Sequence, residues 1–265
     1  MATHGPAAEM QAGLFASKVR MLTISIKSNI DEARRALFLD QKEFERELPK
    51  ALNFTAAETR KHLRLEMEKV FDRPTPFTLN GMFVQQATRD RLESAVFFKD
   101  FAPKGTPAGK YLLAQVMGGS RRQKRSERAF ALAGLSGNRG FWVPGSGAPL
   151  DAHGNVSGPM MVRILAEVKA FGEVGYTANK TAASAKRNKR YRKYNYFVAA
   201  PGGHLAPGVW KREGRSVVPV LIFVEAVDYR KRFDFFGEGE GFARLRFPIE
   251  IDNALRRVFK RQAGR

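Results

Sequence analysis

The sequence has no cysteine, and it has only two tryptophans and four histidines in 265 residues. The lack of cysteine excludes disulfides and thiolate metal sites, and it fits assembly in a reducing cytoplasm. No uninterrupted apolar run approaches the roughly 20 residues that cross a bilayer. The stretch from Met1 to Gly13 also lacks the basic-then-apolar pattern of a signal peptide. We therefore expect a soluble protein with no membrane partner.

Acidic residues are scarce, with 26 Asp plus Glu against 46 Lys plus Arg, so the formal net charge is +20. Such an excess creates a field that attracts polyanions and acidic protein surfaces, and it opposes compact folding through self-repulsion. The charge therefore favours contact with nucleic acid or with an acidic partner. Basic faces that serve only solubility are the alternative, and the charge alone says nothing about the fold.

Familiar catalytic motifs are missing, including the phosphate-binding Walker loop, the nucleophile elbow and the zinc-protease helix signature. The segment from Asp151 to Asn155 contains an aspartate and a histidine that could serve a metal or a hydrolase, but its composition is also that of a tight turn. Glu238 and Glu240 stand between glycines, which predicts a solvated loop rather than a fixed catalytic pair. His62 reads as a surface residue of a charged helix. We expect no enzyme activity, no metal and no cofactor.

Hydrophobic residues make up 43 % of the chain and include 21 phenylalanines, which is enough for a substantial core. Their periodicity predicts strands at 18–27, 88–99, 110–117, 195–200 and 217–227, and helices at 32–47, 50–71, 160–171 and 247–261. This order predicts an α+β fold, with long N-terminal helices and a C-terminal helix packed on one mixed or antiparallel β-sheet. The apolar stripe of the last helix is expected to contain Ile251, Leu255, Val258 and Phe259.

Residues 1–17 are expected to form a flexible N-terminal arm, and 18–265 a single domain with a basic, loop-rich insertion at about 120–194. Pro49 fits either the first turn of a new helix or a kink in a continuing one. Thr78 is expected to cap a short turn at 79–82, and Ser120 a basic helix at 120–135. Residues 137–159, rich in glycine, proline and serine, predict a surface loop.

Two basic segments are candidate sites for a polyanion or an acidic partner. The first comprises Arg121, Arg122, Lys124, Arg125 and Arg128. The second comprises Lys186, Arg187, Lys189, Arg190, Arg192 and Lys193. We expect the second segment to be solvated or disordered until it meets a partner. Interleaved tyrosines could stack on bases, but no recognised nucleic-acid module is visible, so sequence-specific binding is not indicated.

Five stretches together resemble a group of virion proteins from the morphogenesis clusters of long-tailed phages and prophages. They run from Val70 to Asn80, Leu92 to Lys99, Tyr111 to Arg128, Pro207 to Arg212 and Tyr229 to Phe235. Members of this group are described as minor tail, tail-completion or neck proteins. The order of N-terminal strand, long helix and following strands is also similar to the small proteins that complete a tail, including the type called minor tail protein Z. The long insertion after Gly119 departs from that compact pattern.

The resemblance implies a structural virion protein at the head–tail interface or the tail end, made in the host bacterial cytoplasm. It implies copies of the chain arranged in a ring, commonly a hexamer, that completes the tail and joins it to the capsid connector. Neighbours would be tail tube, tail terminator or head–tail connector proteins, with non-specific contact to phage DNA. A DNA-binding accessory protein for packaging or assembly, which uses its basic loops, is the alternative.

Overall fold

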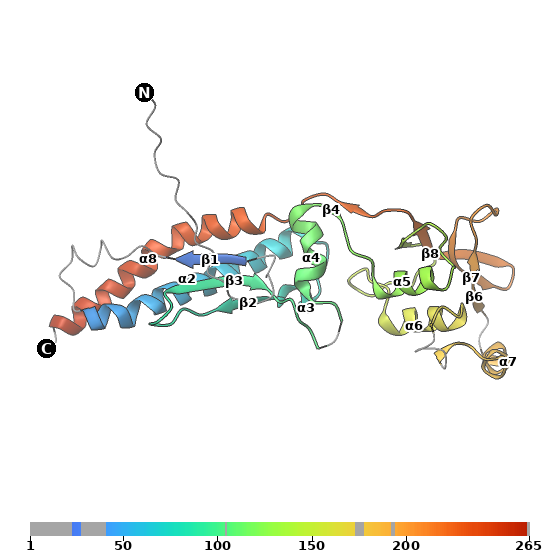
Figure 1. The fold of residues 1–265 in the computed structure, drawn as a ribbon, viewed down its shortest axis with the longest axis horizontal. Coiled ribbons are helices and arrows are strands. Elements are labelled where there is room, and N and C mark those ends of the chain that lie inside the picture. The colour runs from blue at the N-terminus through green and yellow to red at the C-terminus, as the bar shows by residue number, and fades with distance from the viewer. Residues whose placement is uncertain (1–22, 28–40, 104, 173–177, 192–193, 264–265) are drawn as a thin grey trace, which may run out of the picture.

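The computed structural model describes residues 23–27, 41–103, 105–172, 178–191 and 194–263. They form two lobes set end to end along the long axis of the molecule (Figure 1). We call them the helical lobe, with described residues 23–27, 41–103, 105–117 and 230–263, and the sheet lobe, with described residues 121–172, 178–191 and 194–227. The expected flexible arm at 1–17 and most of the helix expected at 32–47 lie outside the described residues.

The helical lobe packs two long antiparallel helices over a three-stranded antiparallel sheet of order β1-β3-β2. Its elements are β1 (Thr23–Lys27), α2 (Gln41–Val70), α3 (Pro76–Leu79), β2 (Met82–Gln85), β3 (Glu93–Phe98), α4 (Ala108–Met117) and α8 (Phe235–Ala263). The sheet lobe has a four-stranded antiparallel sheet of order β5-β8-β7-β6 with three helices. Its elements are α5 (Arg125–Leu132), β5 (Phe141–Pro144), α6 (Gly158–Glu167), α7 (Ala182–Tyr191), β6 (Tyr194–Ala199), β7 (Gly208–Glu213) and β8 (Ser216–Val224).

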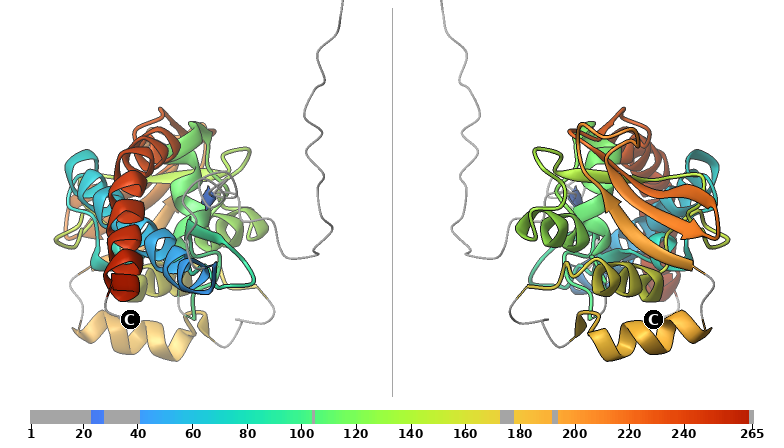
Figure 2. Two further views of the ribbon diagram at one scale, coloured as in Figure 1. Left: turned by 90° about the vertical axis from the view of Figure 1, so that its left-hand side faces the viewer. Right: turned by 90° about the vertical axis from the view of Figure 1, so that its right-hand side faces the viewer.

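A two-stranded ribbon joins the lobes. It pairs β4 (Gly119–Ser120) with β9 (Asp228–Tyr229), so the chain passes once in each direction between the lobes. Viewed from its two ends, the molecule shows the α2–α8 pair at one end and the four-stranded sheet at the other (Figure 2). The α+β fold class is confirmed, but the expectation of one sheet is wrong, because three separate sheets form among the described residues.

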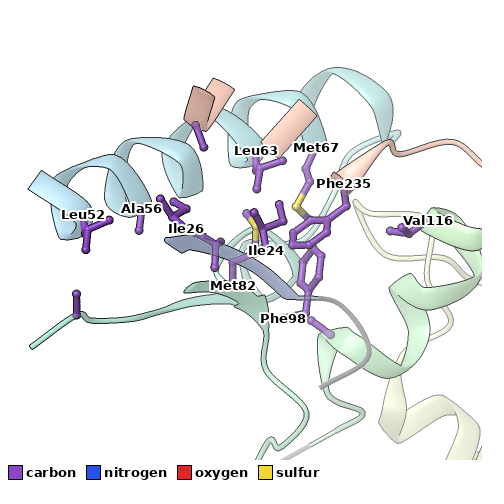
Figure 3. Close-up of a cluster of buried hydrophobic side chains, with 14 of the residues drawn as sticks. Ile24, Ile26, Leu52, Ala56, Leu63, Met67, Met82, Phe98, Val116 and Phe235 are labelled. Atoms are coloured by element: carbon purple, nitrogen blue, oxygen red, sulfur yellow. The ribbon is translucent and has the colours of Figure 1, made fainter. Parts of the chain in front are cut away.

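The core of the helical lobe follows from the apolar period of α2. Leu52, Ala56, Leu63 and Met67 are fully buried at helical spacing on the side of α2 that faces β1, and Met67 lies beside Phe235 at the start of α8 (Figure 3). Pro49 lies inside this continuous helix and does not begin a new one. Where α8 meets β1, Gly239 of α8 leaves room for the Ile24 side chain. A Cβ at position 239 would collide with that side chain.

The sheet lobe has a separate core built on β8, the strand that lies between β5 and β7. Leu221 and Phe223 of β8 are buried together with Phe130 of α5, Ile164 of α6 and Val209 of β7. The expected strand at 217–227 is therefore present and interior, but it belongs to a different sheet from β3. Because this core also takes in strands beyond residue 194, the residues expected to form a projecting insertion fold together with later parts of the chain. The boundaries given to that insertion stay a prediction.

Three local expectations are wrong for identifiable reasons. The strand expected at 110–117 is the helix α4, whose buried residues Ala108, Leu112 and Val116 recur every four positions. The helix expected from Ser120 begins only at Arg125, because Ser120 pairs in β4. The short turn after Pro74 is capped by Thr75 instead of Thr78; the Thr75 hydroxyl accepts from the Thr78 N–H at 3.1 Å.

Two expected loops and one expected core residue also differ. Residues 137–159 contain β5, whose Trp142 is buried and pairs in register with Phe223. Glu238 and Glu240 lie within the first turns of α8 rather than on a loop. Phe259, expected in the apolar stripe of the last helix, is 47 % exposed, although Val258 beside it is buried. The two residues point to different sides because neighbours on a helix are about 100° apart.

Candidate polyanion-binding surface

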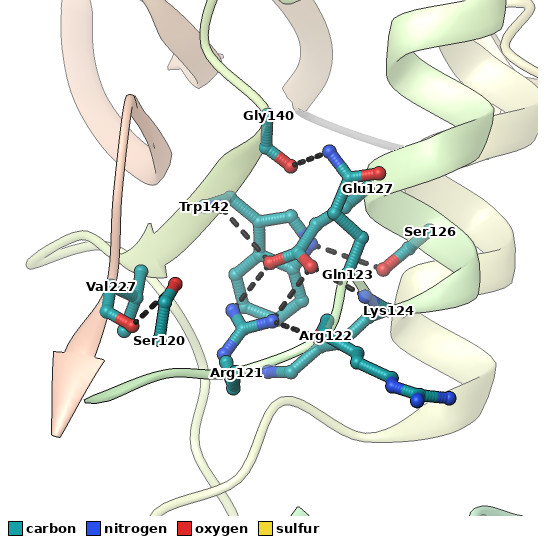
Figure 4. Close-up of polar contacts among 10 residues, drawn as sticks. All are labelled: Ser120, Arg121, Arg122, Gln123, Lys124, Ser126, Glu127, Gly140, Trp142 and Val227. Carbon is teal, nitrogen blue, oxygen red and sulfur yellow. Dashed lines mark hydrogen bonds and ion pairs between the residues drawn. The ribbon is translucent and has the colours of Figure 1, made fainter. Parts of the chain in front are cut away.

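The first basic segment is anchored by a buried carboxylate, Glu127 of α5 (Figure 4). The Arg121 guanidinium donates to both of its oxygens, from Nη1 to Oε2 at 2.8 Å and from Nη2 to Oε1 at 2.5 Å. The backbone N–H of Lys124 also donates to Oε2 at 2.5 Å, and that of Trp142 to Oε1 at 3.1 Å. The Trp142 indole N–H donates to the Ser126 hydroxyl at 3.0 Å. This network fixes the start of α5 against β5.

The electrostatics of Glu127 match that structural role. Burial by itself would raise its pKa, but the hydrogen bonds from Arg121 and from the two backbone N–H groups outweigh burial and lower the pKa. Its side chain is completely buried, and that of Arg121 is 10 % exposed. Arg121 is therefore committed to an internal ion pair, and we withdraw it from the predicted polyanion-binding residues.

Lys124 lies at the edge of the same network. Its ammonium lies 4.1 Å from the centroid of the Trp142 ring, in a cation–π arrangement. Loss of hydration there, together with the nearby Arg121 charge, lowers the pKa of Lys124. This side chain is partly engaged with its own lobe, although it stays open to solvent.

Arg122, Arg125 and Arg128 are exposed, and within the part of the chain that the structure describes no carboxylate pairs with them. Arg125 and Arg128 are three residues apart on α5 and so share a face of the helix. Leu132, one turn further on, is 87 % exposed on that face. The three arginines form an exposed basic surface, and Leu132 lies at its end. Of the first predicted segment, they are the members free to meet a partner.

The described part of the second basic segment belongs to helix α7. Thr181 and Ser184 cap α7 reciprocally: the Thr181 N–H donates to the Ser184 hydroxyl at 2.9 Å, and the Ser184 N–H donates to the Thr181 hydroxyl at 3.2 Å. Lys186 and Arg187 are exposed on this helix. Lys189 and Arg190 also belong to α7, whereas Arg192 and Lys193 lie outside the described residues. Because α6 lies between α5 and α7, the two basic segments are on separate parts of the sheet lobe (Figure 1).

The segment from Asp151 to Asn155 is a tight turn at the joint between the lobes. The Asp151 carboxylate accepts from the backbone N–H groups of His153 at 2.9 Å and Asn155 at 2.8 Å, which confirms the turn interpretation. These hydrogen bonds, that of Asn155 foremost, lower the pKa of Asp151. Arg73 of the helical lobe contacts the turn, because its Nη1 donates to the Ala152 carbonyl at 3.3 Å and its own carbonyl lies 2.9 Å from His153 Nδ1.

One cluster of potential metal ligands is found among the described residues, where α2 meets α8. Single ligand atoms of His62, Glu66 and Glu238 lie within 4.8 Å of one another. The His62 ring stacks on Phe242, with ring centroids 4.5 Å apart, and its Nε2 lies 3.2 Å from a Glu238 oxygen. The Lys69 ammonium lies 2.5 Å from a Glu66 oxygen. The hydrogen bond to Glu66 and the negative charge of Glu66 raise the pKa of Lys69, and the charge of Glu238 adds a smaller effect in the same direction. The positive charge that these carboxylates attract is thus supplied by the chain itself. Sequence reasoning missed this cluster because it assigned Glu238 to a loop.

A hollow of about 400 Å³ lies between α6 and the start of α7. Its lining includes Arg163 and Glu167 of α6, and the residues from Asn179 to Thr181. The Asn179 side chain holds this loop, since its amide nitrogen donates to the Phe171 carbonyl at 2.9 Å. The Glu167 carboxylate accepts from the Tyr196 N–H at 3.0 Å, which ties α6 to β6. The hollow therefore adds polar groups beside α7 but no catalytic arrangement.

Comparison with known proteins adds no information on the family or function of this chain. No family model, no curated protein and no solved structure matches this chain. Within the described residues, no helix is both long enough and apolar enough to cross a membrane.

Proposed function

We propose that this chain is a non-enzymatic structural protein of a bacteriophage particle, located at the neck or the tail end. In this proposal, copies form a ring that completes the tail and joins it to the capsid connector. The exposed basic surfaces of the sheet lobe would face DNA or the acidic surfaces of neighbouring tail proteins.

The observation that carries this proposal is where the resembling stretches lie. Four of the five, although they span the chain from Val70 to Phe235, pack on one another at or near the joint between the lobes. The Phe71 and Phe233 rings meet edge to face at 5.9 Å, and the Phe98 and Phe235 rings lie 5.1 Å apart. The Gln115 carbonyl accepts from the Phe233 N–H at 3.1 Å.

The proline-containing stretch belongs to the same unit. Its Thr78 hydroxyl shares a 2.9 Å hydrogen bond with the Tyr111 hydroxyl of α4. Four of the five stretches that resemble phage virion proteins thus pack as one unit, whereas the fifth, from Pro207 to Arg212, lies along β7 in the sheet lobe.

Deleting the gene from the phage or prophage that carries it tests the proposal. We expect separate heads and tails in the lysate, infectivity restored by the wild-type gene in trans, and the chain detected in purified complete particles by mass spectrometry. Complete infectious particles that lack the chain would overturn the proposal.

The exposed arginines of α5 favour a second candidate function, a DNA-binding accessory protein for packaging or assembly. Arg125→Gln combined with Arg128→Gln should weaken binding to duplex DNA and reduce the slope of log K against log salt by about two. A matched control removes the same charge from the helical lobe, with Arg60→Gln and Arg244→Gln, both exposed positions. An equal effect of both pairs would show that binding depends on net charge rather than on the α5 surface.

A further inference from the structure

Helix α8 has two apolar faces, and only one of them is covered. Ala243, Ala254 and Val258 are buried on the side that packs against the rest of the helical lobe. On the opposite side, Ile249 is 51 % exposed and Phe259 is 47 % exposed. An amphipathic helix at the surface of a single globular unit needs one apolar face, so the exposed apolar residues on the second side are available to a partner.

The exposed face of α8 has an ion pair at its centre. Asp252 and Arg256 are one turn apart between Ile249 and Phe259, and the Arg256 Nε lies 2.7 Å from an Asp252 oxygen. At 100° per residue, all four side chains fall within a narrow stripe. We call Ile249, Asp252, Arg256 and Phe259 the α8 stripe. Leu245, 76 % exposed, extends it by one turn.

Helix α2 carries a stripe of the same kind. Phe54 is 53 % exposed and Leu65 is 55 % exposed, on the side opposite the buried Leu52, Leu63 and Met67 face. Between them, the Lys61 ammonium lies 2.5 Å from a Glu58 oxygen. We call Phe54, Glu58, Lys61 and Leu65 the α2 stripe. Both stripes therefore place an ion pair between two exposed apolar residues.

The two stripes are complementary when the helices run antiparallel. Along α2 the residues advance by four, three and four positions, and backwards along α8 they retreat by three, four and three. Aligned in this way, Phe54 meets Phe259 and Leu65 meets Ile249. Glu58 then meets Arg256, and Lys61 meets Asp252. Every facing pair is apolar with apolar, or opposite in charge.

We propose that the α8 stripe of one copy docks antiparallel on the α2 stripe of a second copy of this chain. The contact is head to tail, because it uses a different face on each copy and leaves both copies with one stripe free for the next. Repetition of such a contact closes into a ring when the rotation permits. The inference rests on the proposed ring-forming function, for which it names the surfaces.

The charge order within the stripes provides a sharp test. An α8 variant, Asp252→Lys with Arg256→Glu, keeps the pair within the helix and the net charge but reverses its direction. An α2 variant, Glu58→Lys with Lys61→Glu, does the same on the other face. Each variant then places like charges opposite each other in the proposed contact, while circular dichroism should show an unchanged fold.

Light scattering and native mass spectrometry of the full chain, over a range of concentrations, give the readout. We expect the wild type to assemble and each variant alone to associate at least about tenfold more weakly. An equimolar mixture of the two variants should assemble again, because each wild-type stripe then finds a wild-type partner and each reversed stripe a reversed one. The chain with all four substitutions should also assemble.

Several outcomes would overturn the contact. A wild type that stays monomeric would do so, as would variants that assemble alone as well as the wild type. The latter is the result expected if α8 paired with a second α8, because a reversed α8 stripe is complementary to itself. The proposed function is judged separately: detection of the chain in complete particles, with assembly unaffected by the reversals, would leave the function standing and remove only this contact.

Discussion

A buried carboxylate where α2 and α8 meet allows the most quantitative prediction. Glu47 of α2 is completely buried, and its oxygens lie 2.8 Å from Arg257 and 2.8 Å from Arg261, both near the end of α8. Lys50, one turn along α2, contributes a third cation at 2.7 Å. Burial alone would raise the pKa of Glu47, but hydrogen bonds from Lys50, Arg257 and Arg261 lower it from 4.5 to about 2.

The sign and size of the effect follow from linkage. Because the pKa of Glu47 is lower in the folded chain, its ionised form stabilises the fold above about pH 4.5, and this contribution is lost as the pH falls towards 2. At 1.36 kcal/mol per pKa unit, the shift corresponds to about 3 kcal/mol as an upper limit. The three cations are 37 % to 44 % exposed, so solvent screening reduces the expected contribution to about 2 kcal/mol.

The variant Glu47→Gln keeps the shape of the side chain and removes its charge. We expect its free energy of unfolding to be lower than that of the wild type by about 2 kcal/mol at pH 7, and the difference to shrink towards zero near pH 2. Urea titrations followed by circular dichroism, at one protein concentration and several pH values, measure this difference. Glu68→Gln, which removes an exposed partner of Arg64 on the same helix, is the control and should differ little at any pH. A difference for Glu47→Gln that is constant from pH 7 to pH 2.5 would refute the reasoning.

Four further substitutions test the cores, the joint and the open side of α8. Glu127→Gln leaves the buried guanidinium beside it without a counter-charge, so the urea midpoint followed by tryptophan emission, which reports the sheet lobe, should fall by the equivalent of about 3 kcal/mol. An unchanged midpoint would contradict a stabilising role for the ion pair. Gly208→Ala should destabilise by about 2 kcal/mol or more, because its Cβ would collide with the Leu221 carbonyl, whereas Gly241→Ala, in open space on α8, should stabilise by about 0.5 kcal/mol. Phe233→Ala empties a buried position at the joint and should cost about 3 to 5 kcal/mol in a thermal or urea melt; a loss below 1 kcal/mol would show that the joint is not packed as described.

Long helices could be predicted from the sequence because their apolar period repeats many times. The period of α2 recurs over more than four turns, so a single ambiguous residue such as Pro49 does not change the assignment. The segment at 110–117 resembles a strand in sequence because it is short and apolar on several sides. Ala108, whose spacing from Leu112 and Val116 indicates a helix, precedes that apolar run. Short apolar runs are ambiguous between helix and strand for this reason.

The division into two lobes could not be predicted from local patterns. Strands β3 and β8 have similar apolar composition, and nothing within either strand specifies which sheet it joins. That choice is made by pairs distant in sequence, such as Trp142 with Phe223, and by the ribbon of β4 and β9, in which each strand has two residues. Strands of two residues show no hydrophobic periodicity, so periodicity in the sequence does not predict the joint between the lobes.

A count of basic residues in the sequence does not show which of them are free to bind a partner on the candidate surface. Arg121 and Arg125 stand four residues apart in one basic run, and composition treats them alike. The distinguishing signal is Glu127, the acidic residue within that run, which is placed to accept from the backbone at the start of a helix and from one preceding arginine. A carboxylate inside a basic segment therefore predicts that one of the cations in that segment is internal.

The same reasoning applies to Glu47 and the basic end of α8. Arg257 and Arg261 bind the other long helix, whereas Arg256 pairs within the exposed stripe. The exposed cations described on α5 and α7 belong to the sheet lobe, and the α2 and α8 stripes belong to the helical lobe. Binding of an acidic partner and contact between copies can thus be separated by mutation, one lobe at a time.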